Sequence, residues 1–216
     1  MNLIIKLFLI IFWLDINNTL AEEPEKVKQL LIENKDFIYS SAVLFNVQPR
    51  LIASIIYVER TLNVNWMEGQ LDLLLAKAGY SSSIGLGQIK IHTAEWIEKK
   101  LHDSTSKYYL GDVYKSYIPK SKSRDEIIER LDGPEWNTKY VAGYIAMFCH
   151  RWLNDGFDIS ARPDIIGTLY SLGPYRVSDG SERKPHVNPK ANYFGEETVK
   201  FYYSDQLSFL FPRVTD

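Results

Sequence analysis

Cysteine is nearly absent from this chain: Cys149 is the only one in 216 residues, so no disulfide can form within it. The residue lies in an apolar stretch, YIAMFCHRW, that has helical character. A cysteine in such a setting is usually a buried, inert thiol, and we do not expect it to act as a nucleophile.

Histidine is also scarce. The four histidines, His92, His102, His150 and His186, are scattered along the chain, and neither an HExxH motif nor a Cys–His ligand spacing occurs. We therefore expect no metal site and no other cofactor. No serine stands in a nucleophile-elbow sequence, which argues against an α/β-hydrolase type of active site.

An excess of basic residues is lacking as well. The 25 Lys and Arg residues face 27 Asp and Glu residues, which gives a net charge of -2 and no expectation of a nucleic-acid partner. Hydrophobic residues make up 45% of the chain, enough for one globular domain with a core. The 14 tyrosines favour a surface that binds sugars or peptides, because the ring stacks while the hydroxyl hydrogen-bonds.

No hydrophobic run is long enough to cross a bilayer comfortably; the apolar run at residues 7–14 is short. Lys6 precedes this run, and Thr19-Leu20-Ala21 follows it before an acidic stretch. This order predicts a signal peptide over residues 1–21 that is cleaved after Ala21, with an uncleaved anchor as the alternative. We expect a periplasmic or secreted protein with no stable membrane span after cleavage. No cysteine follows the signal to carry a lipid.

Helical patterns dominate the rest of the chain, residues 22–216, and period-2 runs flanked by hairpin turns are nearly absent, so we expect a mainly α domain. The spacing of apolar residues predicts helices over residues 23–45, 48–62, 70–80, 91–102, 124–133, 137–156, 162–173 and 195–211. Two segments, 81–89 and 173–194, are predicted to be irregular, and long loops in a compact domain are often functional.

Glu59 stands at the end of the helix predicted over residues 48–62. Ile52, Ile55 and Ile56 precede it by seven, four and three positions, so they share its side of the helix. Burial there raises the pKa of a carboxyl group, as a general acid near neutral pH requires. The alternative is an ion pair between Glu59 and Arg60 or another cation at the helix end.

A glycine-rich segment, SIGLGQI, follows further along the chain. Gly85 and Gly87 flank Leu86 immediately before Gln88, and two glycines permit tight folding against a ligand or a helix end. An ordinary turn is the simpler interpretation. No strand precedes the segment, so we exclude a dinucleotide-binding loop.

A third segment, LYSLGPYRV, places Tyr170 and Ser171 at the end of a helix that Gly173-Pro174 stops. Taken alone, packing plus a helix cap explains these residues.

In order and local spacing, these motifs resemble those of lytic transglycosylases and goose-type lysozymes, a branch of the lysozyme-like superfamily. That branch has a Pro-initiated helix ending in Glu-Ser, then Gly-Leu-Met-Gln, a Pro-Glu-x-Asn run opening a central helix, Ala-Tyr-Asn-x-Gly and a late tyrosine. The matching segments here, over roughly residues 46–205, are VQPRLIASIIYVER, GLGQI, PEWNTKYVAGYI, LYSLGP and KFYYSDQ.

The chain departs from the family pattern at several positions. Arg60 stands where the family has serine, Gly87 where methionine is usual, and Ser171 where asparagine is usual. Residues 66–80 look like an insertion, and further extra chain occupies residues 103–126.

The resemblance implies a single lysozyme-like helical domain with a substrate cleft, and peptidoglycan glycan strands as its partner. It implies cleavage of the MurNAc-β-1,4-GlcNAc bond with formation of a 1,6-anhydro product, Glu59 acting first as acid and then as base. Gln88 and the backbone of Gly85, Leu86 and Gly87 hold the sugar in this view. Tyr170 and Ser171 hydrogen-bond the glycan, and Tyr202 or Tyr203 orients Glu59.

Two alternatives remain. A hydrolytic muramidase needs a second carboxylate to activate water, for which Glu68, Asp72 and Asp103 are candidates. A catalytically inactive protein that binds peptidoglycan or a cell-envelope partner is the other, motivated by Arg60 and Ser171.

Overall fold

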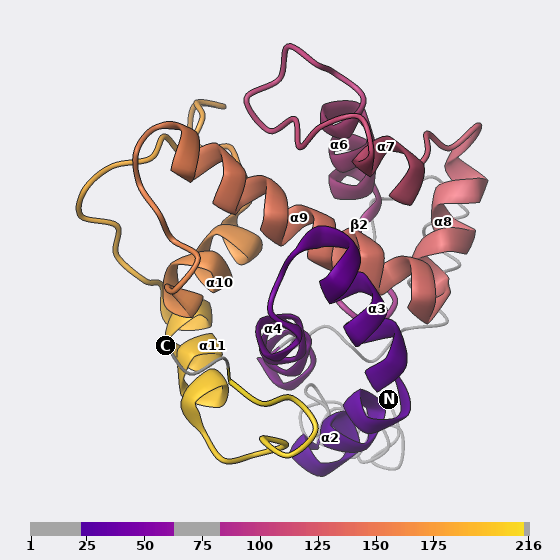
Figure 1. Ribbon diagram of the computed structural model, residues 1–216, viewed down its shortest axis with the longest axis vertical. Coiled ribbons are helices and arrows are strands. Elements are labelled where there is room, and N and C mark those ends of the chain that lie inside the picture. Colours follow the sequence, from indigo (N-terminus) through magenta and orange to yellow (C-terminus); the bar gives the residue numbers. More distant parts are fainter. Residues whose placement is uncertain (1–22, 63–82, 214–216) are drawn as a thin grey trace, which may run out of the picture.

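The computed structural model describes residues 23–62 and 83–213, which form one compact, mainly helical body (Figure 1). This confirms the mainly α class. The helices are α2 (Pro24–Glu33), α3 (Lys35–Phe45), α4 (Pro49–Leu62), α6 (Ile91–Leu101), α7 (Tyr114–Tyr117), α8 (Arg124–Asp132), α9 (Pro134–Asn154), α10 (Pro163–Leu172) and α11 (Tyr193–Tyr203). Two short strands, β1 (Ser83–Ile84) and β2 (Ile89–Lys90), pair antiparallel.

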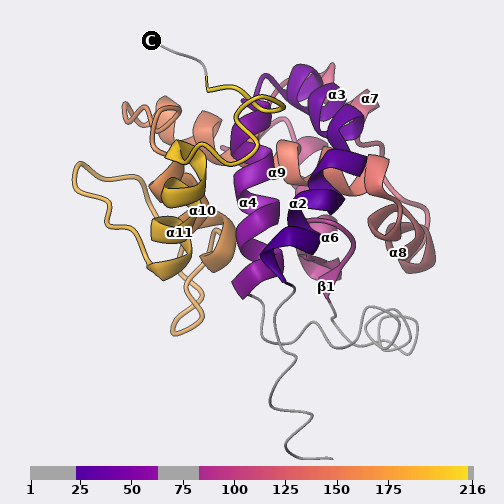
Figure 2. The same cartoon turned by 90° about the horizontal axis from the view of Figure 1, so that it is seen from below.

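Helix α4 lies in the middle of the body, between α10 and α11 on one side and α2, α3 and α9 on the other (Figure 2). Its sequence is apolar on almost every side, as expected for a helix with neighbours all round. Ile52, Ile55 and Ile56 are fully buried. Whatever stands at the end of this helix is therefore held by a rigid, enclosed element.

The helix predicted over residues 23–45 is in fact two helices, α2 and α3, separated at Asn34. The Asn34 side-chain amide donates to the Leu30 carbonyl at 2.8 Å, and its backbone leaves the helical conformation with ψ 12°. A short polar side chain competes for backbone groups in this way and breaks a helix. The periodicity of apolar residues is similar on both sides of the break and did not reveal it.

The helix predicted over residues 195–211 ends early, because α11 stops at Tyr203. Arg50, near the start of α4 and fully buried, donates from Nη2 to the carbonyls of Phe201 at 2.8 Å and Ser204 at 2.7 Å. Its Nε donates to the carbonyl of Tyr202 at 3.1 Å. This guanidinium supplies the donors that the last carbonyls of a helix otherwise lack, and it joins the end of α11 to the start of α4.

Helices α4, α6, α8 and α10 follow the predicted ranges closely, whereas α9 begins at Pro134, three residues earlier than expected. Helix α7, within residues 103–126, was not predicted. Segment 173–192 contains no helix and only an isolated bridge between Tyr175 and Glu182, as predicted for an irregular loop. Within residues 23–62 and 83–213, none of the helices combines the length and apolarity needed to cross a bilayer.

Several predictions fall outside the described residues: the signal peptide over 1–21, the helix over 70–80, the insertion at 66–80, and the carboxylates Glu68 and Asp72. Cys149 lies on α9 and is half-buried. Burial raises the pKa of its thiol to about 12, so the group stays protonated near neutral pH, as expected for an inert cysteine.

Candidate active site

Glu59 lies in the last turn of α4, directly beyond the three buried isoleucines. Burial raises the pKa of its carboxyl from 4.5 to about 8, against the smaller opposing effects of the Lys90 and Arg60 charges. Desolvation has this effect because the charged carboxylate loses more on burial than the neutral acid does. The group is thus largely protonated at neutral pH.

A second feature of the Glu59 carboxyl is its lack of a bonding partner in the described part of the chain. Among the described residues, no hydrogen bond or ion pair joins it to another side chain, and part of the residue's surface stays accessible. A protonated acid without an internal acceptor is able to give its proton to a bound ligand.

Arg60 does not neutralise Glu59. Its side chain is buried, with 8% of the residue exposed, and it extends to the glycine-rich segment. Nε donates to the Leu86 carbonyl at 3.1 Å, and Nη2 donates to the Gly85 carbonyl at 3.0 Å. The alternative of an ion pair between the two neighbours is wrong.

Residues 85–88 form the turn between β1 and β2, and we call them the glycine loop. Gly85 has φ +73°, which favours glycine, and Gln88 adopts φ 49°. The Gln88 side-chain amide donates back to the Gly85 carbonyl at 2.9 Å, and Gln88 is 9% exposed. The Leu86 side chain is buried in the core, so only its backbone is available to the site.

Asn137 of α9 hydrogen-bonds the backbone of the glycine loop and of β1. Its Oδ1 accepts from the Gly87 amide at 2.7 Å, and its Nδ2 donates to the carbonyls of Ile84 at 2.9 Å and Leu131 at 2.8 Å. The side chain is fully buried. Sequence analysis noted the PEWN segment but assigned no role to this asparagine.

Gly87 has no room for a side chain. A Cβ there would lie 2.3 Å from Cγ2 of Val141 and 3.0 Å from the Tyr170 hydroxyl. The close approach lets Tyr170 of α10 donate to the Gly87 carbonyl at 2.7 Å. Glycine fits at this position because it has no Cβ.

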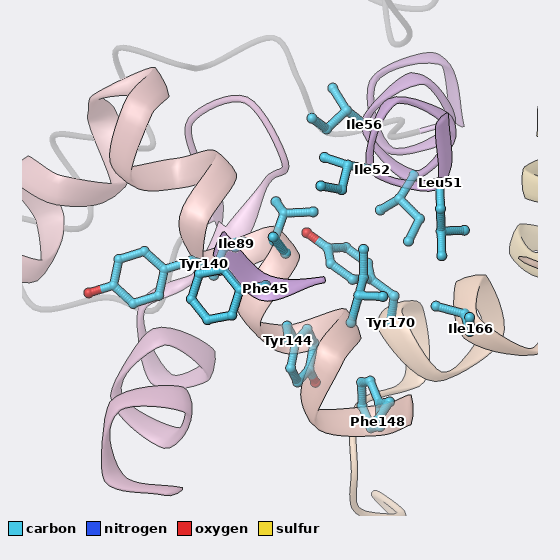
Figure 3. Close-up of a cluster of buried hydrophobic side chains, with 14 of the residues drawn as sticks. Phe45, Leu51, Ile52, Ile56, Ile89, Tyr140, Tyr144, Phe148, Ile166 and Tyr170 are labelled. Atoms are coloured by element: carbon cyan, nitrogen blue, oxygen red, sulfur yellow. The ribbon is translucent and has the colours of Figure 1, made fainter. Parts of the chain in front are cut away.

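Tyr170 lies beside the Glu59 carboxyl. Burial raises the pKa of its hydroxyl, and the negative charge of Glu59, which lies within electrostatic range, raises it further. Figure 3 shows Tyr170 between Tyr144 of α9 and Ile52 of α4, with its hydroxyl on the side of the α4 isoleucines. The structure thus brings Glu59, Tyr170 and the glycine loop together.

Tyr144 is a site residue that the sequence analysis did not single out. Its ring contacts that of Tyr170, with centroids 5.5 Å apart, and the residue is 3% exposed. Within the described residues its hydroxyl has no hydrogen-bond partner, and burial raises its pKa. Its place on the same face of α9 as Asn137, seven residues earlier, is the signal that would have indicated it.

Lys90, the second residue of β2, was also missed. Its side chain is exposed. Of the two positive charges that lower the pKa of Glu59, that of Lys90 has the larger effect. The ammonium group is therefore near the carboxyl and faces solvent. It stands two residues after Gln88, so the same hairpin carries both groups.

Ser171, the residue after Tyr170, is exposed and bonded within the protein. Its hydroxyl donates to the Thr168 carbonyl at 3.1 Å and accepts from Nδ2 of Asn192 at 2.9 Å. These contacts join the end of α10 to the start of α11. The structure therefore gives this serine a helix-capping position.

Tyr202 and Tyr203 occupy a different region. The Tyr202 hydroxyl donates to the Gln48 side chain, just before α4 begins and roughly 16 Å along that helix from Glu59. Tyr203 is 54% exposed. The start of α11 lies nearer the site, since Phe194 stacks on Tyr170 at 6.3 Å. The orienting role expected for Tyr202 or Tyr203 finds no support in these positions.

No protein-family model matches this chain, and no curated protein matches it. Function is therefore inferred from the residues and their geometry.

Within the part of the chain that the structure describes, no second carboxyl group acts on Glu59. Lys90 and Arg60 are the only charged groups found to act on its pKa among the described residues, and neither is an acid. Asp103 instead accepts from the amide and hydroxyl of Thr105, at 3.0 and 2.6 Å, in an exposed turn. The described residues contain no group of three His, Cys, Asp or Glu that could hold a metal ion.

Proposed function

We propose that this protein is a peptidoglycan lytic transglycosylase built on a lysozyme-like helical domain, with its substrate cleft along the glycine loop and Glu59. The observation that carries the proposal is the buried carboxyl of Glu59, which has no hydrogen-bond partner among the described residues, near the Tyr170 hydroxyl and the glycine loop. The motif order of the sequence supplies the substrate class.

The reaction needs a single carboxyl group. Glu59 protonates the glycosidic oxygen, and the N-acetyl group of the substrate stabilises the positive charge that develops at the anomeric carbon. The resulting carboxylate then takes the proton of the sugar's C6 hydroxyl, whose oxygen closes onto the anomeric carbon to give the 1,6-anhydro product. Acid–base assistance of this kind is worth about 10²–10⁴-fold in rate, and an internal nucleophile adds the advantage of orientation.

Two further groups suit glycan binding. The Tyr144 hydroxyl has no hydrogen-bond partner among the described residues, and the exposed ammonium of Lys90 lies near Glu59. A buried hydroxyl gains a hydrogen bond when a sugar arrives, and the ammonium group attracts a carboxylate such as that of muramic acid. With the predicted signal peptide, these features favour action in the periplasm or outside the cell.

Among the described residues, no second carboxyl acts on Glu59, which suits a transglycosylase, whereas a hydrolytic muramidase needs a second acid to activate water. Glu68 and Asp72, two of the candidates for that acid, lie outside the described residues. A binding protein without activity has no need of a carboxyl kept protonated by burial. Arg60 was one of the two reasons for considering an inactive protein. Its guanidinium donates to the Gly85 and Leu86 carbonyls and forms no ion pair with Glu59.

Digestion of purified sacculi, with the fragments analysed by mass, tests the proposal. Anhydro ends are the expected product. Reducing ends would instead identify a muramidase, and intact glycan with retained protein would identify a binder. Glu59→Gln is expected to abolish cleavage, whereas Glu135→Gln, which alters an exposed carboxylate on α9, leaves it unchanged.

A further inference from the structure

Arg60 joins the helix that carries Glu59 to the loop beside it. Its two hydrogen bonds run from the last turn of α4 to the consecutive carbonyls of Gly85 and Leu86. The planar guanidinium presents two donors in fixed directions, so it sets both the distance and the orientation between helix and loop. Glu59 is its immediate neighbour in the chain.

The glycine loop is held from two other sides as well. Asn137 binds the Gly87 amide from α9, and Tyr170 binds the Gly87 carbonyl from α10. Neither of these contacts involves α4. Of these three attachments, only that of Arg60 fixes the loop relative to the helix on which the proposed acid stands.

We propose that Arg60 is a positioning residue. It fixes the glycine loop relative to Glu59, so that a sugar bound to the loop has its glycosidic oxygen within reach of the Glu59 carboxyl. The inference rests on the proposed function for its catalytic consequence. The guanidinium touches neither the substrate nor the reacting atoms in this role. It acts through Gly85 and Leu86.

Two variants test the role in steady-state kinetics on glycan strands. Arg60→Gln removes both the positive charge and the pair of guanidinium donors. Arg60→Lys keeps the charge but offers a single donor group. We expect kcat to fall about 10- to 100-fold in the Gln variant and less in the Lys variant, with KM changed less than about threefold, because misplacement by about 1 Å costs this much. An unchanged kcat overturns the proposal. So does a rise in KM alone, which would indicate a direct contact with substrate.

Hydrogen exchange of the substrate-free protein gives a readout that does not depend on activity. The amides of Gly87 and Gln88 donate to Asn137 and Gly85 respectively, and they are expected to exchange at least tenfold faster in Arg60→Gln than in the parent. Unchanged exchange refutes the attachment even if catalysis is lost. If exchange is faster in Arg60→Gln but the parent itself cuts no glycan, the attachment is real and the proposed function is wrong, which removes the catalytic part of this inference.

Arg50→Lys is the matched control. Arg50 stands on the same helix and also donates to backbone carbonyls, but at the far end of α4. Its replacement is expected to lower the melting temperature while leaving kcat within about twofold of the parent and exchange in the glycine loop unchanged. An equal loss of kcat in this variant would mean that the Arg60 effect is general destabilisation.

Discussion

The Tyr170 hydroxyl donates to the Gly87 carbonyl at 2.7 Å, across 83 positions of sequence. This bond places the phenol and the glycine loop on the same side of Glu59. Tyr144 lies against the same ring, but its hydroxyl has no partner among the described residues. The two tyrosines therefore differ in what their hydroxyls do in the absence of substrate.

Replacing each tyrosine by phenylalanine separates these roles. Tyr170→Phe leaves the Gly87 carbonyl without its donor and is expected to lower the free energy of unfolding by about 1–2 kcal/mol. Tyr144→Phe removes an unpaired hydroxyl and should change stability by less than about 0.5 kcal/mol, while it raises KM for glycan. Chemical denaturation together with kinetics measures both effects. Equal destabilisation by the two changes would contradict the assignment.

Gly87→Ala is expected to disrupt the loop. The added methyl group would lie 2.3 Å from Cγ2 of Val141, which is too close unless one of the two groups moves. We expect a loss of about 1–3 kcal/mol in the free energy of unfolding, together with a severe loss of activity. Gly133→Ala is the control, since its Cβ meets only ordinary contacts at 3.7 Å. A Gly87→Ala protein as stable and active as the parent would show that the loop has more space than described.

Asn137→Ala removes three hydrogen bonds at once, those to the Ile84 and Leu131 carbonyls and that from the Gly87 amide. The expected cost is about 2–4 kcal/mol, measured by thermal or denaturant unfolding. Asn154→Ala, at an exposed position of α9, should cost little. Asn137→Asp keeps the acceptor for Gly87 but loses both donors, so it should be destabilised as well, which an effect of side-chain volume alone does not predict.

The pH dependence of activity follows from the pKa of Glu59. Because the acid must be protonated at the start of the reaction, the rate should fall as pH rises through about 8. Lys90, Arg60 and Tyr170 are the described groups that interact with this carboxyl. Lys90→Gln removes a charge that lowers the pKa, so the fall should move to higher pH. Lys99→Gln, on the exposed side of α6, should not move it.

The same carboxyl makes stability depend on pH. Its pKa is raised in the folded protein, from 4.5 to about 8, so the stability that it contributes is full below about pH 4.5 and is lost as pH rises to 8. The Glu59→Gln variant does not lose stability in this way, because glutamine does not ionise. The variant should therefore become more stable relative to the parent as pH rises from 5 to 8, by about 3–4 kcal/mol over this range. A constant difference across this range would contradict the raised pKa.

Sequence analysis was most successful where structure is local. The isoleucines on the Glu59 side of α4 are buried as the periodicity predicts, because helical spacing alone decides which residues share a face. The direction of Arg60 was not decided in this way. Its acceptors lie 25 and 26 residues away. The Gly87 amide that donates to Asn137 lies 50 residues from it, and the acceptor of Tyr170 lies 83 residues away. Such partners are chosen by how helices pack, which a single sequence does not display.

The glycine loop depends for its shape on α4, α9 and α10, three helices drawn from both halves of the chain. The shortest stretch of chain that contains all of these supports runs from α4 to the end of α10, residues 49–172. The glycine loop therefore reaches its final shape only once helices that precede and follow it in the chain have packed together.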